Sequence, residues 1–281
     1  MISSTDRSAL VLAGGGLAGI AWETGVLTGL ARAGVHLGDA DTVIGTSAGA
    51  TVGAQLRSGV DLEELLHDQL AGTEPELPGS QGVISVLSQL YWFLGRQDPT
   101  PGRRWFGTQA LQGSVGNAAA RRQVIEGRLS SPEWPERDLW VTAVDAHSGE
   151  LRVFDRDSGV SLIDAVMASC AVPLVWPPVE IEGRHYIDGA IPSVANAHLA
   201  AGFSRVVVVA LEKVPLMRHD SVSGVLRRLK IPRWCVVSSP RRALLRIGGN
   251  YLDPAVRQRA AEAGLREGVR CADRVRAVWA T

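Results

Sequence analysis

The stretch Val43-Ile44-Gly45-Thr46-Ser47-Ala48-Gly49-Ala50 joins a short apolar run to a Gly-x-Ser-x-Gly pattern. It is typical of a buried strand that turns tightly into a helix. Because Gly45 and Gly49 lack a β-carbon, the backbone can bend sharply and neighbouring elements can approach it. The Ser47 hydroxyl would then lie at a helix N-terminus, where unpaired N–H groups stabilise negative charge. The pattern predicts a nucleophile elbow, although alone it also arises by chance.

Strands and helices alternate around this stretch. We expect strands at 9–13, 42–44, 139–144, 151–154 and 206–211, a hairpin of 179–181 with 185–187, and helices at 20–33, 47–57, 162–169, 194–201 and 254–278. The alternation predicts an α/β fold of three layers, in which helices cover both faces of a mostly parallel sheet. The β-branched run at 206–211 is typical of a central parallel strand. No linker divides the chain, so we expect a single domain over 1–281, with a core at about 8–212 and a C-terminal helical part at about 216–280.

Residues 72–117 allow two interpretations. Loops rich in Pro and Gly at 74–82 and 98–102 flank an apolar run at 83–94, which contains Tyr91, Trp92 and Phe93. The run would form either a helix packed on the core or a lid over the site that contacts an acyl chain.

Composition limits the class of protein. The chain has 281 residues with 29 basic and 29 acidic side chains, so as a whole it has no electrostatic preference for nucleic acid. Its three cysteines, Cys170, Cys235 and Cys271, form no Cys-x-x-Cys pair, which favours reduced thiols over disulfides or a zinc site. The polar start does not resemble a signal peptide, and no apolar run approaches the ~20 residues of a membrane span. We expect a cytoplasmic protein without a metal.

The glycine stretch Gly14-Gly15-Gly16-Leu17-Ala18-Gly19 has two readings. It matches the dinucleotide-binding fingerprint, but that fingerprint needs an acidic residue at the end of the next strand, where this chain has the Gly-x-Ser-x-Gly pattern instead. The second reading is an oxyanion hole, in which backbone N–H groups of Gly14, Gly15 and Gly16, together with that of Ala48, stabilise a tetrahedral intermediate. The oxyanion-hole interpretation fits the sequence better than the dinucleotide-binding one.

As a nucleophile, Ser47 would need a base that accepts the proton of its hydroxyl group. None of the histidines lies in an obvious turn after a strand; they are His36, His67, His147, His185, His198 and His219. Asp188-Gly189-Ala190 does follow a strand. An aspartate with a pKa of about 3.9 is a weak base in water, but burial raises its basicity. The alternative is an ordinary Asp-Gly turn.

With these three motifs in their order, the chain resembles a bacterial patatin-like phospholipase. The resemblance continues through Ile20-Ala21-Trp22-Glu23, Ala168-Ser169-Cys170-Ala171-Val172-Pro173 and Asn196-Ala197-His198-Leu199-Ala200-Ala201-Gly202, and is weak over 72–117 and 215–246. It implies a serine lipid acyl hydrolase with a Ser47–Asp188 dyad, no catalytic histidine and no cofactor. The motif glycines would be Gly19, Gly45, Gly49 and Gly189. Two departures are Ala18, where many members have Arg or Lys, and Ala13, where many have glycine or an acid.

The resemblance leaves substrate and partners open. A soluble esterase, a thioesterase, an acyltransferase and a weakly active lipid-binding regulator remain alternatives. Between 218 and 246 there are eight basic residues and one acidic residue, and apolar residues at helical spacing accompany them. Such a segment would contact an anionic membrane through Arg227, Arg228, Lys230 and Trp234, or form an ordinary solvated face.

Overall fold

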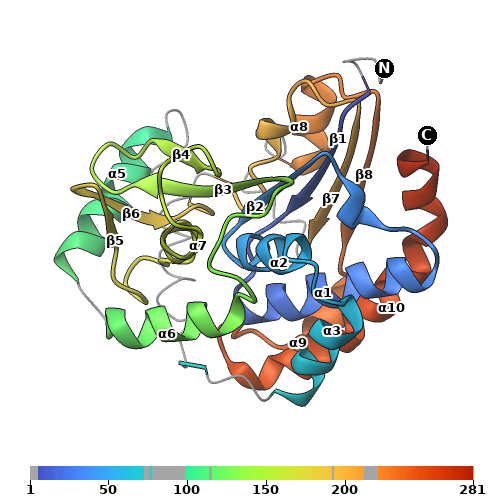
Figure 1. Ribbon diagram of the computed structural model, residues 1–281, viewed down its shortest axis with the longest axis horizontal. Coiled ribbons are helices and arrows are strands. Elements are labelled where there is room, and N and C mark those ends of the chain that lie inside the picture. The colour runs from blue at the N-terminus through green and yellow to red at the C-terminus, as the bar shows by residue number, and fades with distance from the viewer. Residues whose placement is uncertain are drawn as a thin grey trace.

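The computed structural model describes residues 6–72, 76–77, 99–113, 116–191, 193–211 and 221–280 (Figure 1). These residues contain one eight-stranded sheet in the order β5-β6-β3-β2-β1-β7-β8, with β4 paired to β3 off this path. The strands are β1 (Ser8–Leu12), β2 (Thr42–Thr46), β3 (Asp138–Asp145), β4 (Leu151–Phe154), β5 (Val179–Ile181), β6 (Arg184–Asp188), β7 (Arg205–Ala210) and β8 (Arg233–Ser238).

The sheet is mixed, with a parallel centre. β8, β7, β1, β2 and β3 run parallel, whereas β4 and β6 pair antiparallel with β3, and β5 pairs antiparallel with β6. The expected parallel strand at 206–211 is confirmed as β7, between β1 and β8. The sequence pattern does not predict β8, which lies in the C-terminal part, about 216–280, where we expect helices. Trp234-Cys235-Val236-Val237 is a short apolar run without polar alternation, and such a run does not distinguish a strand from a helix segment.

Side chains of β1 point alternately into two cores. Leu10 and Leu12 join a core beneath α1, α2, α7 and α10, whereas Ala9 and Val11 join one beneath α8 and the 3-10 turn η2. The helices are α1 (Gly16–Arg32), α2 (Ala48–Arg57), α3 (Leu62–Ala71), α5 (Pro99–Gln112), α6 (Ala118–Arg128), α7 (Leu162–Ser169), α8 (Val222–Arg228), α9 (Arg241–Ile247) and α10 (Arg257–Trp279), and the 3-10 turns are η1 (Leu37–Asp39), η2 (Ala197–Ala200) and η3 (Pro254–Val256). The three-layer α/β/α architecture is confirmed.

Three local expectations differ from the structure. The first helix begins at Gly16, because the glycine stretch itself provides its N-terminus. Residues 99–102 of the expected loop form the start of α5, where prolines suit the first turn because an N–H is not needed there. Only η2 forms within 194–201, because Asn196 adopts a left-handed conformation (φ 45°) that no α-helix accommodates. The apolar run at 83–94 lies outside the described residues.

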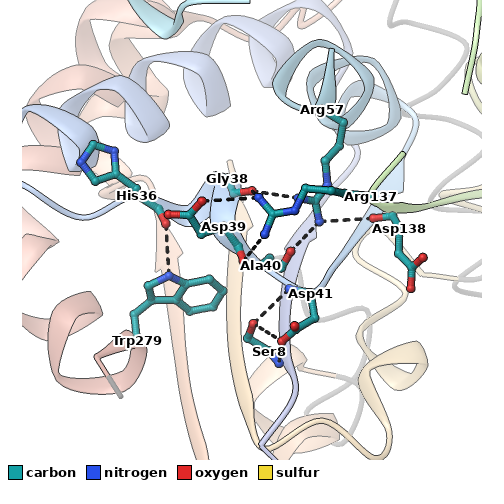
Figure 2. A network of polar contacts seen from close by, with 10 residues as sticks. All are labelled: Ser8, His36, Gly38, Asp39, Ala40, Asp41, Arg57, Arg137, Asp138 and Trp279. Carbon is teal, nitrogen blue, oxygen red and sulfur yellow. Dashed lines mark hydrogen bonds and ion pairs between the residues drawn. The ribbon is translucent and has the colours of Figure 1, made fainter. Parts of the chain in front are cut away.

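A polar network closes the amino ends of the parallel strands (Figure 2). The Arg57 guanidinium donates to the carbonyl oxygens of Gly38 at 2.8 Å and Ala40 at 2.7 Å. Asp41 accepts hydrogen bonds from both the N–H and the hydroxyl of Ser8, each at 2.7 Å. Side-chain hydrogen bonds therefore stabilise this end of the sheet. A site is expected at the other end, where the parallel strands have their carboxyl ends.

Candidate active site

Ser47 occupies a strained turn between β2 and α2. Its backbone has φ 52° and ψ −112°, in the left-handed half of conformational space that non-glycine residues rarely adopt. A Cβ added at Gly45 would lie 2.6 Å from Ala50 Cα, and one at Gly49 would lie 2.2 Å from the Leu12 carbonyl oxygen. Glycine is therefore required on both sides of the serine, and the turn has the shape of a nucleophile elbow.

The structure brings Ser47 to Asp188, the last residue of β6. The Ser47 hydroxyl donates to Asp188 Oδ2 at 2.7 Å, and the two residues are 6% and 3% exposed. The other carboxylate oxygen, Oδ1, accepts the Ala190 N–H at 2.8 Å. The Ser47 N–H donates to the Ser169 hydroxyl at 2.8 Å, which fastens the elbow to the end of α7. Asp188 thus forms an Asp-Gly turn and at the same time presents one oxygen to the serine.

The environment makes Asp188 more basic than an exposed aspartate. Burial raises its pKa to about 6, although the hydrogen bonds from Ala190 and Ser47 and the positive charge of Arg121 lower it. Such a carboxylate is ionised at neutral pH yet has an affinity for a proton that suits a general base.

A buried amide holds the Asp188 turn against the elbow. Asn196 Nδ2 donates to the Gly189 carbonyl at 2.9 Å, to Thr46 Oγ1 at 3.1 Å and to Thr142 Oγ1 at 3.3 Å. A Cβ at Gly189 would lie 2.3 Å from the Thr142 carbonyl oxygen, so only glycine allows this close approach. Asn196 therefore links the carboxyl ends of β2 and β6 to the middle of β3.

The glycine stretch lies beside the elbow, but its donors differ from our expectation. A Cβ at Gly14 would lie 3.6 Å from Ser47 Cβ. The Gly14 N–H already donates to the Val194 carbonyl at 2.8 Å, so Gly14 is not a free donor as the sequence suggested. Within the described ranges, the N–H groups of Gly15, Gly16 and Ala48 have no acceptor. A Cβ at Gly19 would lie 3.0 Å from Ala48 Cβ, which places the first turns of α1 and α2 next to each other.

Two neighbouring cavities lie near Ser47, and Ser47 itself lines the smaller one. A small one of about 30 Å³ is bordered by Ser47, Gly16, Ala48 and residues of several other elements. A larger one of about 250 Å³ lies between α6, α7 and the segment before β5. Arg121, Cys170 and Trp176 line both cavities. The small cavity has room for on the order of two water molecules, so an ester substrate needs the larger one.

Sequence reasoning missed Ser169, Asn196 and Arg121. Ser169 and Asn196 lie within stretches that resemble the family, and that resemblance was the only signal available for them. Arg121 lies in a run of alanines and arginines that gives no signal of burial. Among the described residues, Asp188 is the only side chain that bonds to the Ser47 hydroxyl, and His219 lies outside them.

Arg227, Arg228, Lys230 and Trp234, for which we expect a membrane contact, lie at the opposite end of the sheet from this site. Leu226 of α8 is fully buried, and Val222, Val225 and Leu229 pack against the same core, so the apolar side of the helix is used within the protein. Lys230 precedes the amino end of β8, whereas Ser47 follows the carboxyl end of β2, which is parallel to it. In the described portion of the chain, no helix combines the length and the apolar character that a membrane crossing requires.

Comparison with known proteins gives one family match and several matches among solved structures. No curated protein matches it. Matching solved structures include VipD from Legionella pneumophila, with 16% identity, a TM-score of 0.46, and coverage of 96% of this chain and 67% of that chain. They also include the type III effector ExoU, with 16% identity, a TM-score of 0.42, and coverage of 96% of this chain and 53% of that one. The family model for patatin-like phospholipases matches residues 10–201. The chain therefore belongs to the patatin-like phospholipase family.

Proposed function

We propose that this chain is a serine lipid acyl hydrolase of the phospholipase A type, with Ser47 as the nucleophile and Asp188 as the general base. The observation that carries the proposal is the 2.7 Å hydrogen bond from the Ser47 hydroxyl to a buried carboxylate whose pKa is raised to about 6. Membership of the patatin-like phospholipase family supports a lipid ester as the substrate.

The first half of the reaction forms an acyl-enzyme. Asp188 accepts the hydroxyl proton as Ser47 Oγ attacks the ester carbonyl carbon. The carbonyl oxygen becomes negative, and the free N–H groups of Gly15, Gly16 and Ala48 are the donors available to stabilise it. When the intermediate collapses, the bond to the alcohol oxygen breaks and Asp188 returns its proton to that oxygen.

The second half releases the fatty acid. Asp188 takes a proton from water, whose oxygen attacks the acyl carbon, and collapse of the second intermediate returns the proton to Ser47. An alcohol or thiol acceptor in place of water would give acyl transfer by the same steps. The two outcomes therefore differ only in which acceptor reaches the acyl-enzyme.

Two substrates and one variant test this function. Hydrolysis of a short-chain p-nitrophenyl ester and release of fatty acid from phospholipid vesicles are measured for the wild type and for Ser47→Ala. We expect fatty acid release from vesicles and its loss by a factor on the order of 10⁴ in the variant. Turnover of the soluble ester alone would instead favour an esterase or thioesterase. Absence of both activities would favour a lipid-binding regulator.

Covalent labelling separates a reactive serine from a vestigial one. A fluorophosphonate should modify the wild type at Ser47 and leave Ser47→Ala unlabelled. Asp188→Asn should lose ester turnover by a factor similar to that of Ser47→Ala, because both groups act as a unit. An active Asp188→Asn protein would exclude the dyad.

Peripheral membrane contact and a cytoplasmic location stay proposals. Arg227, Arg228 and Lys230 are exposed, so a membrane contact at α8 would be mainly electrostatic. Vesicle flotation with anionic lipids should therefore weaken in the double variant Arg227→Glu, Arg228→Glu. Unchanged flotation would exclude a membrane contact through Arg227 and Arg228.

A further inference from the structure

Arg121 is a buried arginine at the junction of the two cavities. It lies on α6, is 8% exposed and lines both the small cavity that contains Ser47 and the larger one beside it. Its guanidinium lies 4.4 Å from the centre of the Trp176 ring, which is a cation–π contact. The side chain is therefore held against Trp176 in the wall that the two cavities share.

No described carboxylate forms an ion pair with Arg121. Its guanidinium stacks on the ring of Trp176, and Glu76 and Asp188 act on it only through their charge, without a direct ion pair or hydrogen bond within the described ranges. The nearby Glu76 is already engaged, because its two oxygens accept hydrogen bonds from Arg128, and Arg257 lies 3.9 Å from it. Glu76 thus pairs with Arg128 and Arg257 and not with Arg121, and Asp188 is the other described carboxylate whose charge acts on Arg121.

A buried charge without a partner is unfavourable unless something supplies the opposite charge. Burial lowers the pKa of Arg121 to about 10, and the neighbouring Arg128 adds to this effect. The guanidinium is still protonated at neutral pH. The cation–π contact offsets only part of the cost of burial. The cavity therefore has the character of a site that is completed by an anionic ligand.

We propose that Arg121, stacked on Trp176, is an anion-binding subsite that holds a phosphate group of the substrate and so selects phosphate-bearing lipids over neutral esters. The substrate part of this proposal rests on the proposed function of Ser47, whereas anion binding does not. A guanidinium can donate two parallel hydrogen bonds to phosphate oxygens, a geometry that an uncharged ester cannot satisfy. In a lipid whose ester reacts at Ser47, the anionic group nearest to that ester on the alcohol side is the phosphate.

Direct binding tests the subsite without catalysis. Isothermal titration calorimetry measures octyl phosphate, octanol and inorganic phosphate on the wild type, on Arg121→Gln and on Arg122→Gln. Arg122 is a matched control, because it is the next residue of α6 but pairs with Asp164 and Glu126 outside the cavities. We expect octyl phosphate to bind Arg121→Gln at least about tenfold more weakly than the other two proteins, and octanol to bind all three alike.

Each other result overturns a part of the proposal. Equal binding of octyl phosphate to the wild type and Arg121→Gln, or no binding to either, excludes an anion subsite at Arg121. Binding of inorganic phosphate as tightly as octyl phosphate identifies a free-phosphate site and excludes the lipid part. Arg121→Lys keeps the positive charge, so it should bind octyl phosphate more tightly than Arg121→Gln. This comparison separates the loss of the charge from a general loss of structure in the glutamine variant.

Kinetics then tests selectivity. Arg121 also lowers the pKa of Asp188, so a change at 121 affects every substrate through the base. The ratio of kcat/KM for a phospholipid to that for a neutral ester cancels this shared effect. The ratio should fall about tenfold or more in Arg121→Gln and stay constant in Arg122→Gln. If the wild type hydrolyses neither substrate but binds octyl phosphate through Arg121, the subsite stands and the proposed hydrolase function fails.

Discussion

The Ser47 hydroxyl donates to Asp188 Oδ2 at 2.7 Å, while Asp188 Oδ1 accepts the Ala190 N–H at 2.8 Å. The carboxylate is therefore fixed at both oxygens, and only Oδ2 is directed at the serine. In the described part of the chain, no histidine bonds to the serine. A carboxylate acting alone must have its own pKa adjusted, and burial provides that adjustment.

Ester hydrolysis should depend on pH through Asp188. Its pKa is raised to about 6 by burial, and only the ionised form can accept the Ser47 proton. We expect kcat/KM to rise as pH rises through about 6 and then to stay level to about pH 8. A soluble p-nitrophenyl ester, assayed across this range, gives the profile of the free enzyme. A rate that is constant between about pH 5 and pH 7 would show that Asp188 is not the base.

The same raised pKa predicts a conflict between stability and activity. A carboxyl group whose pKa is higher in the folded state contributes stability that is complete below its unfolded pKa of 3.8 and is lost as pH rises through about 6. Asp188→Asn removes the ionised form. The variant should therefore be more stable than the wild type by up to about 3 kcal/mol at about pH 8, and should lose this advantage at about pH 4.

Urea unfolding at both pH values measures this difference. Asp157→Asn is the matched control, because Asp157 lies in an exposed turn and the same chemical change there should alter the stability at neither pH. If Asp188→Asn gave no stabilisation at the higher pH, the ionised carboxylate would not be unfavourable in the folded state.

The sequence identified Ser47 and Asp188 as candidate residues, but not the contacts that bring them together. Ser47 and Asp188 were identified by motif, but they are 141 residues apart, and only the pairing of β6 with β3, and of β3 with β2, brings them together. The local sequence pattern did not predict the conformation or burial of residues whose side chains make tertiary contacts. Asn196 interrupts an expected helix because its amide bonds to Gly189, and Arg121 is buried because Trp176 covers it. The Asn196 amide also bonds to Thr46 and Thr142, 150 and 54 residues away, and Trp176 lies on a different segment from Arg121, so no local pattern could reveal these contacts.

Asn196→Ala should disturb both stability and turnover. The change removes a buried amide whose two N–H bonds are shared among three acceptors, and leaves a non-glycine residue in a left-handed conformation without these contacts. We expect a loss of about 2–4 kcal/mol of stability, since each bond contributes about 1 kcal/mol and buried groups lose their partners. Because Gly189 adjoins Asp188, kcat should fall about tenfold or more.

Ser221→Ala is the control for Asn196→Ala. Ser221 accepts the Gly224 N–H at the N-terminus of α8, so the change costs about 1 kcal/mol at a position outside the dyad. Urea unfolding and steady-state kinetics on both variants separate a general loss of stability from a local effect. An equal effect of the two changes on kcat would show that Asn196 does not position the dyad.

Arg57→Leu should lower stability without altering catalysis. Arg57 donates to the carbonyl oxygens of Gly38, Ala40 and Asp138 at the amino ends of β2 and β3, where Figure 2 shows it reaching across the loop before β2. Loss of these charge-assisted hydrogen bonds should cost about 2–3 kcal/mol. The measurement is urea unfolding, paired with kcat/KM for a soluble ester.

The opposite ends of the sheet should respond independently, because Arg57 contacts the amino ends of the strands and the dyad lies at the carboxyl ends. Arg137→Leu is the matched control: its side chain is 54% exposed and contacts the same loop, so it should cost less than about 1 kcal/mol. If kcat/KM in Arg57→Leu fell together with stability, under conditions where the variant is folded, the network in Figure 2 would be coupled to the elbow through β2. An unchanged kcat/KM would show that the strained turn at Ser47 is held by its own neighbours, Ser169, Gly45 and Gly49.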